Sequence, residues 1–345
     1  MKDRVYGLLR RLGVFWFSGL FFRKQLLILC YHGISISDEH NWWPGVFMTE
    51  QKFRKRLEIL KEGGYRVIGL GEALQKLDDN KLPAKSIVIT ADDGYLNSPQ
   101  TFAKACLDFG YPSTIYVTSY YAEKQTPIFN VTVQYLFWKI NELELWGDFS
   151  KIGLTGTSYL DISTAEKRKE IAQQVVTFGR THCNEEQRQD ILRNICGLVG
   201  QDYASLARSG MFRLMGAPEI RSIANSGIDV QLHTHRHSFP VDQAAASREI
   251  EENREFLKPL VKRPLEHFCY PSGFWEPRQL PWLRELGIQS ATTCRLGFVS
   301  RNSDKLCLNR YLDKQTISDH EFRAEISGFL NIARRIRGKV KILWK

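Results

Sequence analysis

Two short polar clusters contain the residue types that hold a divalent metal ion or move a proton. The first is the carboxylate pair Asp92-Asp93, which precedes Gly94, and the second is the segment His233 to His237, which contains three histidines. Two imidazoles and one carboxylate make a three-ligand site that leaves coordination positions open for water and substrate. The pattern therefore predicts a metal-binding site. Turn-forming aspartates and surface histidines are the alternative interpretation.

The histidine spacing narrows the ligand set. His233 and His237 are four positions apart, which fits one face of a helical turn better than any pair that includes His235. His235 nevertheless remains an alternative to either neighbour. Adjacent carboxylates such as Asp92 and Asp93 repel each other unless a cation or a proton lies between them, which also favours an ion at this site.

The polar clusters share one position relative to the expected strands. Apolar segments of strand type span 26–30, 86–90, 228–232 and 267–270, and polar clusters follow them directly, at Tyr31, Asp92, His233 and Pro271. Segments of helical type alternate with these strands, which predicts parallel βα units. Because the carboxyl ends of parallel strands meet on one face of a barrel, the four clusters should converge there.

The same alternation divides the chain into five parts. We expect a basic amphipathic N-terminal segment over 1–25, a first part of the barrel over 26–126, a helical insertion over 127–215, a second part of the barrel over 216–318 and a basic C-terminal helix over 319–345. Inside the insertion, the segments that begin at Ser163 and Asn184 have the form of helix-starting capping boxes. A chain of 345 residues with 43% hydrophobic residues can form a large core and a satellite subdomain.

The net charge and the cysteine content indicate which binding partners and which cellular compartment to expect. The formal net charge of +10 suits an anionic phospholipid surface, a sugar-diphosphate lipid or an acidic glycan. No stacking-aromatic motif indicates nucleic acid, which we therefore do not expect as a partner. The seven cysteines are scattered and form no C-x-x-C pair, which favours a reducing compartment. We expect a cytoplasmic protein.

The N-terminal apolar stretch suggests a membrane interface. Residues 12–22 lie between Arg10-Arg11 and Arg23-Lys24, and they are too few to span a bilayer. They also lack the cleavage pattern of a signal peptide. Trp and Phe residues between basic flanks fit a helix that lies in a membrane interface, and a core-packing helix is the alternative. Peripheral association at the inner membrane face is the corresponding prediction.

Three motifs resemble those of the polysaccharide deacetylase family, which is carbohydrate esterase family 4 or the NodB-homology domain. Thr90 to Gly94 resembles T-F-D-D-G, His233 to His237 matches H-[ST]-x-x-H, and Phe268 to Gly273 resembles F-x-Y-P-x-G. The chain looks nearest to exopolysaccharide and poly-N-acetylglucosamine deacetylases. The resemblance implies an α/β fold, a distorted (β/α)7-type barrel with a helical insertion and peripheral N- and C-terminal helices.

The resemblance also implies a role for each matched residue. Asp93, His233 and His237 would bind a divalent ion, Zn²⁺ with Co²⁺ or Ni²⁺ as alternatives, and Asp92 would be the base that activates water. Contacts to substrate or oxyanion would come from Tyr95, Tyr270, Pro271, Ser272 and Arg310. Tyr31-His32 resembles an early Y-H motif in members that act on β-1,6-linked poly-N-acetylglucosamine. His32 is therefore the candidate general acid, and a structural histidine at a strand end is the alternative.

Two positions depart from the family pattern. Ala91 replaces the Phe of the first motif, and Cys269 stands where many members have the Arg that steadies the base. Arg310 is a candidate replacement for that Arg, or it forms a surface pair with Asn309. A late histidine motif for the general acid is not evident, since His320 lies in a poor context.

These observations predict metal-dependent hydrolysis of the N-acetyl group of N-acetylhexosamine residues. The substrate would be an N-acetylated glycan, a poly- or oligosaccharide or a lipid-linked precursor, in envelope or exopolysaccharide biosynthesis. A catalytically inactive glycan-binding relative and a metal amidase that acts on a non-sugar amide are the alternatives.

Overall fold

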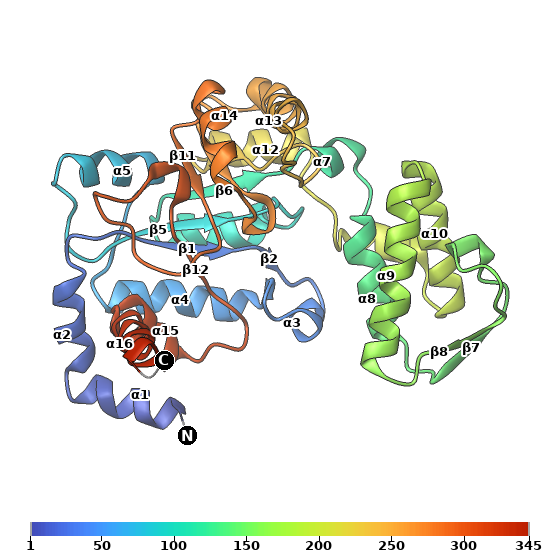
Figure 1. The fold of residues 1–345 in the computed structure, drawn as a ribbon, viewed down its shortest axis with the longest axis horizontal. Coiled ribbons are helices and arrows are strands. Elements are labelled where there is room, and N and C mark those ends of the chain that lie inside the picture. Colours follow the sequence, from blue (N-terminus) through green and yellow to red (C-terminus); the bar gives the residue numbers. More distant parts are fainter. Residues whose placement is uncertain (1, 344–345) are drawn as a thin grey trace.

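The computed structural model describes residues 2–343 and contains one large parallel sheet surrounded by helices (Figure 1). Seven strands follow one another in the order β11-β10-β9-β6-β5-β1-β12, and β4 pairs with β5 beside this path. The strands are β1 (Leu27–Tyr31), β4 (Arg66–Val67), β5 (Ser86–Ala91), β6 (Ser113–Val117), β9 (Asp229–Leu232), β10 (His267–Cys269), β11 (Ser290–Thr292) and β12 (Tyr311–Leu312). β1, β5 and β6 are buried along their whole length, as strands covered on both faces must be.

The segment 308–312 joins the two ends of this path. Leu308 forms a parallel bridge with Thr292 of β11, and a few residues later Tyr311 of β12 pairs with Leu29 of β1. Segment 308–312 therefore closes the sheet into a ring, with a single bridge at the β11 side among the residues that the structure describes. The expected α/β fold with a distorted (β/α)7-type barrel is confirmed.

Helices cover the outside of the barrel. They are α4 (Glu50–Glu62), α5 (Leu70–Asp78), α6 (Lys104–Asp108), α7 (Tyr120–Lys124), α12 (Ala217–Asn225), α13 (Gln243–Leu257) and α14 (Leu280–Glu285). Alternate residues of a strand enter different clusters, because side chains point to opposite faces of a sheet. Leu29 and Ile89 pack with Phe53 of α4, whereas Ile28 and Val88 join a cluster on the other face. The barrel wall is thus sealed on both sides.

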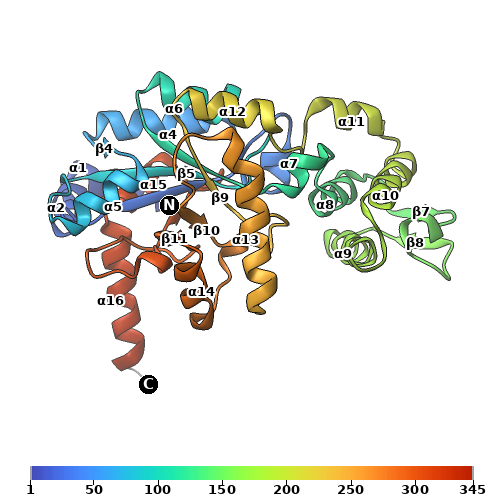
Figure 2. The same ribbon diagram turned by 90° about the horizontal axis from the view of Figure 1, so that it is seen from above.

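The residues between α7 and α12 form a lobe with a hydrophobic core of its own (Figures 1 and 2). Its elements are α8 (Phe129–Lys139), α9 (Ala165–His182), α10 (Glu185–Leu198), α11 (Tyr203–Ser209) and the hairpin β7 (Glu144–Trp146) with β8 (Tyr159–Asp161). The capping box at Asn184 is complete, but α9 is capped by Thr164 instead of Ser163. The hairpin adds strands to a segment expected to be helical, and the boundaries 127–215 stay a prediction.

Helices from both ends of the chain pack on one another. They are α1 (Lys2–Arg11), α2 (Val14–Phe21), α15 (Asp319–Ile326) and α16 (Phe329–Leu343), with α1 against α15 and α2 against α16. The expected single C-terminal helix is interrupted at Gly328, whose φ of +80° is left-handed and whose missing Cβ would lie 2.2 Å from the Phe22 ring. Lys345, part of the predicted basic tail, lies outside the described residues.

A buried ion pair ties α15 to the barrel. Arg56 of α4 donates to Asp313 at 2.7 Å, to Asp319 at 2.6 Å and to the Ile317 carbonyl at 2.6 Å. The Arg56 and Asp313 side chains are fully buried. Such pairs are costly to break, because removing one partner leaves a buried charge uncompensated.

Large apolar side chains are exposed along α1 and α2. They are Val5, Leu8, Leu12, Trp16, Phe17, Leu20 and Phe21, and we call them the apolar strip. Phe17 and Phe21 are 60% and 75% exposed. None of the helices within 2–343 is both long enough and apolar enough to cross a bilayer. The strip is therefore a surface feature of short helices.

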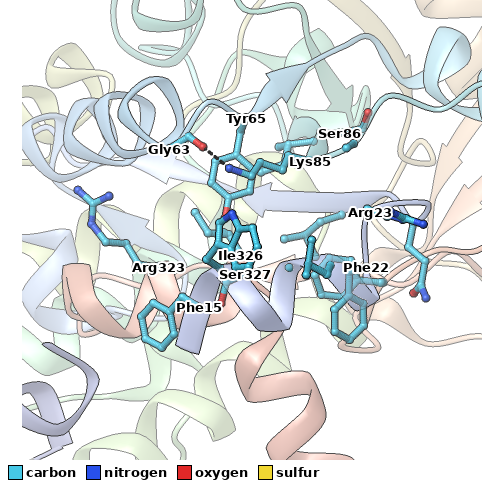
Figure 3. A pocket seen from close by; sticks show the side chains of 18 of the residues that line it. Phe15, Phe22, Arg23, Gly63, Tyr65, Lys85, Ser86, Arg323, Ile326 and Ser327 are labelled. Atoms are coloured by element: carbon cyan, nitrogen blue, oxygen red, sulfur yellow. Dashed lines mark hydrogen bonds between the residues drawn. The ribbon is translucent and has the colours of Figure 1, made fainter. Parts of the chain in front are cut away.

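A hollow of about 440 Å³ lies beneath α2 (Figure 3). Apolar side chains such as Phe15 and Phe22 line it, and the cations Arg23, Lys85 and Arg323 surround it. The hollow also touches the first residues of β1 and β5. It therefore lies at the amino ends of the barrel strands.

Candidate metal centre and active site

The barrel brings the predicted polar clusters to one face. His32 follows β1, Asp92 and Asp93 follow β5, His233 follows β9 and Pro271 follows β10. β1 pairs with β5, β9 pairs with β10, and β6 joins the two pairs. All four clusters lie at carboxyl ends of parallel strands, where barrel enzymes build their sites.

Asp93, His233 and His237 form a compact group of donor atoms. The Asp93 Oδ1 atom lies 3.4 Å from His233 Nε2 and 3.5 Å from His237 Nε2, and one ligand atom from each residue lies within 4.8 Å of the others. Left-handed backbone at Asp93 (φ 72°) and His237 (φ 53°) turns both side chains into the group. Non-glycine residues tolerate such conformations where the surroundings impose them, often at functional sites.

Hydrogen bonds fix the His233 ring in a form that can bind a metal. Its Nδ1 donates to the Cys269 carbonyl at 2.8 Å, so Nε2 is the ring nitrogen that faces Asp93 and would bind an ion. The His233 backbone N–H donates to Asn253 Oδ1 at 2.9 Å, and the Asn253 amide donates to the Val117 carbonyl at 3.0 Å. Asn253 is fully buried on α13 and carried no motif signal, so the sequence alone did not identify it.

The charges of the group suit a divalent cation. Burial would lower the pKa of His233, but the neighbouring Cys269 and the hydrogen bond to Asp93 outweigh it and raise that pKa well above its usual value, so without an ion this ring carries a proton that a divalent ion would displace. Burial alone would raise the pKa of Asp93, but the hydrogen bond to His233 and the charge of His237 outweigh it and lower that pKa to about 2. Desolvation of the ring lowers the pKa of His237 to about 4. Near neutral pH, Asp93 is therefore anionic and His237 neutral. One carboxylate and two imidazole nitrogens with an open side form a donor set that fits Zn²⁺.

Arg310 holds Asp92, and the Cys269 thiol of the third motif adds a longer hydrogen bond to Asp92 Oδ2 at 3.4 Å. The guanidinium donates from Nη1 to Asp92 Oδ1 at 2.7 Å and from Nη2 to Oδ2 at 2.8 Å, and both side chains are buried. The alternative of an Arg310 surface pair with Asn309 is wrong. The small Cys269 side chain lies 3.2 Å from Arg310 Nη2, in the space that a larger residue would fill. Burial would raise the pKa of Asp92, but Arg310 holds that pKa far below its usual value.

His32 lies beside this pair. Its Nε2 atom is 3.7 Å from Asp92 Oδ2, and the ring remains partly exposed. The candidate acid and the candidate base thus share one wall of the site. This position allows a proton to pass between them, or between either group and a bound substrate.

His235 is separate from the cluster. Its Nδ1 lies 2.9 Å from the Ser119 hydroxyl and its Nε2 lies 3.7 Å from Glu252, so the alternative ligand points elsewhere. The segment His233 to His237 is also not helical. The helical-turn argument for the outer pair was wrong, although the fold does bring those two rings together.

Most of the residues predicted to contact the substrate are buried, and Ser272 is the exposed one among Tyr95, Tyr270, Pro271 and Ser272. Tyr95 is buried beside Asp93, and burial together with that carboxylate raises its pKa. The Tyr270 hydroxyl donates to the Leu306 carbonyl at 2.9 Å and its ring is fully buried, so this side chain is a core residue, which corrects its expected role as a substrate ligand. Pro271 is buried, and Ser272 is exposed with φ 55°. The turn can therefore contact a substrate only through Ser272 and its backbone.

Comparison with known proteins identifies the family and the fold of this chain. The fold and the strand-end cluster are those of a barrel enzyme whose site lies at the carboxyl ends of its strands. The model of the polysaccharide deacetylase family matches residues 79–291, so the chain belongs to that family. No curated protein sequence matches the chain.

Solved structures share the fold at low sequence identity. The Streptococcus pyogenes deacetylase PplD in complex with acetate has a TM-score of 0.57 at 15% identity, covering 88% of this chain and 98% of that one. IcaB from Ammonifex degensii has a TM-score of 0.53 at 18% identity, covering 88% and 97%. A de-N-acetylase from Aggregatibacter actinomycetemcomitans has a TM-score of 0.51 at 12% identity, covering 87% and 98%.

Proposed function

We propose that this protein hydrolyses the N-acetyl group of N-acetylhexosamine residues in a glycan, with Zn²⁺ as its ion. One observation carries the proposal: the Asp93, His233 and His237 cluster lies beside an Asp92 that Arg310 holds ionised. Family membership and the similarity to a structure described as a de-N-acetylase support the same reaction. Envelope or exopolysaccharide biosynthesis is the setting that fits this activity.

Each residue of the site has a separate role in the proposed deacetylation. Asp93, His233 and His237 would hold the ion, which supplies Lewis-acid polarisation of the acetamide carbonyl and a lower pKa for water. Asp92 accepts the proton of the attacking water. His32 donates a proton to the leaving amine, and the backbone N–H of Ser272 stabilises the oxyanion. Buried Arg310 keeps Asp92 oriented and ionised.

Loss of the ion should abolish the activity. We expect the purified protein to contain one divalent ion per chain, and His233→Ala to lose both this ion and acetate release from N-acetylglucosamine oligomers. A chelator should have the same effect, reversed by Zn²⁺. Elemental analysis and an acetate assay measure the two quantities.

His235→Asn is the matched control, because it changes the same segment outside the cluster. It should retain the ion. If it loses the ion while His233→Ala keeps it, the ligand assignment fails. An ion without acetate release from any glycan would support the inactive glycan-binding relative, and release from simple acetamides alone would support a non-sugar amidase.

We also propose that the apolar strip on α1 and α2 rests on an anionic membrane surface. Arg10, Arg11 and Arg23 flank the strip, and Asp3 is its one acidic neighbour within α1 and α2 as described. Aromatic side chains between cations suit the boundary between lipid headgroups and acyl chains. The inner membrane face is the anionic surface expected for such a protein.

Removing two aromatic rings from the strip should release the protein from vesicles. The double variant Phe17→Ala/Phe21→Ala should lower partition onto phosphatidylglycerol vesicles by about 10²- to 10⁴-fold, because each buried ring contributes about 1.5–3 kcal/mol. Vesicle sedimentation measures this partition. Phe274→Ala removes an exposed ring elsewhere and should change nothing. If the unchanged protein, the double variant and Phe274→Ala bind vesicles equally, the apolar strip is not the membrane-binding surface.

A further inference from the structure

Two adjoining hollows lie where the lobe meets the barrel loops. One, of about 380 Å³, lies between α3 (Glu39–Trp42), α8 and α9 and presents Trp42, Trp43 and Trp138. The other, of about 540 Å³, shares Trp138 and Arg168 with it and continues along the loop after α8. Because they share these residues, the hollows form one surface, which we call the tryptophan groove. Figure 1 shows α3 facing α8 across this junction.

The groove presents aromatic faces that are held in place. Trp43 and Trp138 are 41% and 37% exposed. The Trp42 ring lies 5.5 Å from Trp43 and 5.4 Å from Tyr135, and Tyr135 lies 5.8 Å from Trp138. The two exposed indoles are thus supported by packed rings behind them. A pyranose ring has an apolar C–H face that can stack on such a surface and a polar rim that stays wet.

Polar groups beside the indoles favour a sugar over a lipid chain. Arg168 donates to the Ile162 carbonyl at 3.2 Å, and neither Arg168 nor Lys169 forms an ion pair with an acidic group within residues 2–343. Asn141 and Ser163 line the second hollow. These donors can bond hydroxyl and acetamide oxygens, whereas an acyl chain would gain nothing from them.

A continuous chain of contacts links the groove to the site. Tyr95 is buried beside Asp93, and its ring lies 5.2 Å from the Phe47 ring. Phe47 in turn lies 6.2 Å from Trp42. The strand β2 (Gly33–Ile34) follows His32 directly, and α3 begins a few residues later at Glu39. The buried rings of Tyr95 and Phe47 therefore lie between the site and the groove, so a glycan must extend beyond them to contact both.

The loop before α3 is fastened to the lobe. Asp38 accepts hydrogen bonds from Lys139 at 2.6 Å and from the Tyr135 hydroxyl at 2.5 Å, both on α8. These bonds hold Trp43 of the barrel loop and Trp138 of the lobe in a fixed relation. The groove is a preformed surface, which lowers the ordering cost of binding.

We propose that the tryptophan groove binds sugars of the glycan chain distant from the residue being deacetylated. This inference rests on the proposed function and specifies its substrate as a chain long enough to reach both the site and the groove. The groove then contributes to affinity for long substrates and contributes nothing for short ones.

Kinetics on oligomers of two lengths test the proposal. For the N-acetylglucosamine hexasaccharide, Trp43→Ala and Trp138→Ala should each raise KM about tenfold with kcat unchanged, in the range of a well-placed aromatic anchor. For the disaccharide, both parameters should equal those of the unchanged protein. Trp146→Ala, which removes an exposed indole from the β7 hairpin of the same lobe, is the matched control and should have no effect.

Binding measured without turnover separates this inference from the proposed function. The hexasaccharide should change the intrinsic tryptophan fluorescence of the unchanged protein, and Trp138→Ala should abolish most of that change. If all variants have equal KM values on the hexasaccharide and release acetate normally, the groove does not bind the glycan, while the proposed deacetylase function is unaffected. If no oligomer releases acetate, a fluorescence response that depends on Trp138 still supports the groove, and its absence overturns it.

Discussion

Asp92→Asn should lower kcat by about 10²- to 10⁴-fold while the protein keeps its ion, because the amide retains the shape of the carboxylate but cannot accept the proton of water. Asp93, His233 and His237 are unchanged in this variant, so elemental analysis should still find the ion. The acetate assay on N-acetylglucosamine oligomers measures the rate.

The paired measurement makes the result specific. A protein that has lost both rate and ion would show a disrupted cluster rather than a missing base. An Asp92→Asn protein with the rate of the unchanged enzyme would show that another group accepts the proton, and His32, 3.7 Å away, would be the next residue to test.

Arg310→Met should lower the free energy of unfolding by about 3–5 kcal/mol, because Asp92 would remain buried without its partner. The sign of the pH effect follows from the same pair. Arg310 depresses the folded-state pKa of Asp92, so its ionisation stabilises the fold above the unfolded pKa and this contribution is lost only in strong acid. Without Arg310, burial raises the pKa. Activity should then increase with pH, while ionisation of Asp92 costs stability.

Arg56→Met is the matched control for this prediction. Arg56 is also fully buried and paired with a buried aspartate, Asp313, but it lies away from the site. Its loss should destabilise the protein to a similar extent and leave the pH dependence of acetate release unchanged. Denaturant unfolding and pH-rate profiles of both variants measure the contrast. Identical pH profiles would show that Arg310 supports the fold but does not tune Asp92.

Local patterns predicted what depends on local structure. The buried runs that became β1 and β5 were evident because apolar residues fill the whole strand, and the polar residues after them mark strand ends. Because the strands are parallel, their carboxyl ends lie on the same face of the barrel. This reasoning placed Asp93, His233 and His237 together without any measurement of distance.

Contacts between segments far apart in the chain could not be predicted from the sequence. The pairing of Asp92 with Arg310 spans 218 positions, and nothing near either residue indicates the other. Asn253 is one of many polar residues on an amphipathic helix, and only the packing of α13 shows that it bonds to His233. The backbone turn at His237 departs from the helix that its spacing suggested, because the loop takes left-handed conformations there.

The N-terminal stretch shows why two interpretations were open. α2 is apolar on all sides, so no periodic pattern separates a face that packs from a face that is exposed. In the structure, Ser18 is buried and bonds to the Ser327 carbonyl at 3.1 Å, while Phe17 points outward. One helix thus packs on α16 and also presents an apolar surface.

The hollow beneath α2 lies at the amino ends of β1 and β5, and His32 and the pair Asp92-Asp93 lie at their carboxyl ends. A five-residue strand separates the two by about 17 Å before any loop is added. If the apolar strip lies on a bilayer, the length of the barrel strands would hold the Asp93, His233 and His237 cluster at a distance from the lipid headgroups. On this proposal a substrate must extend that far from the bilayer, so we expect a long glycan chain to be deacetylated in preference to a single sugar attached to a lipid.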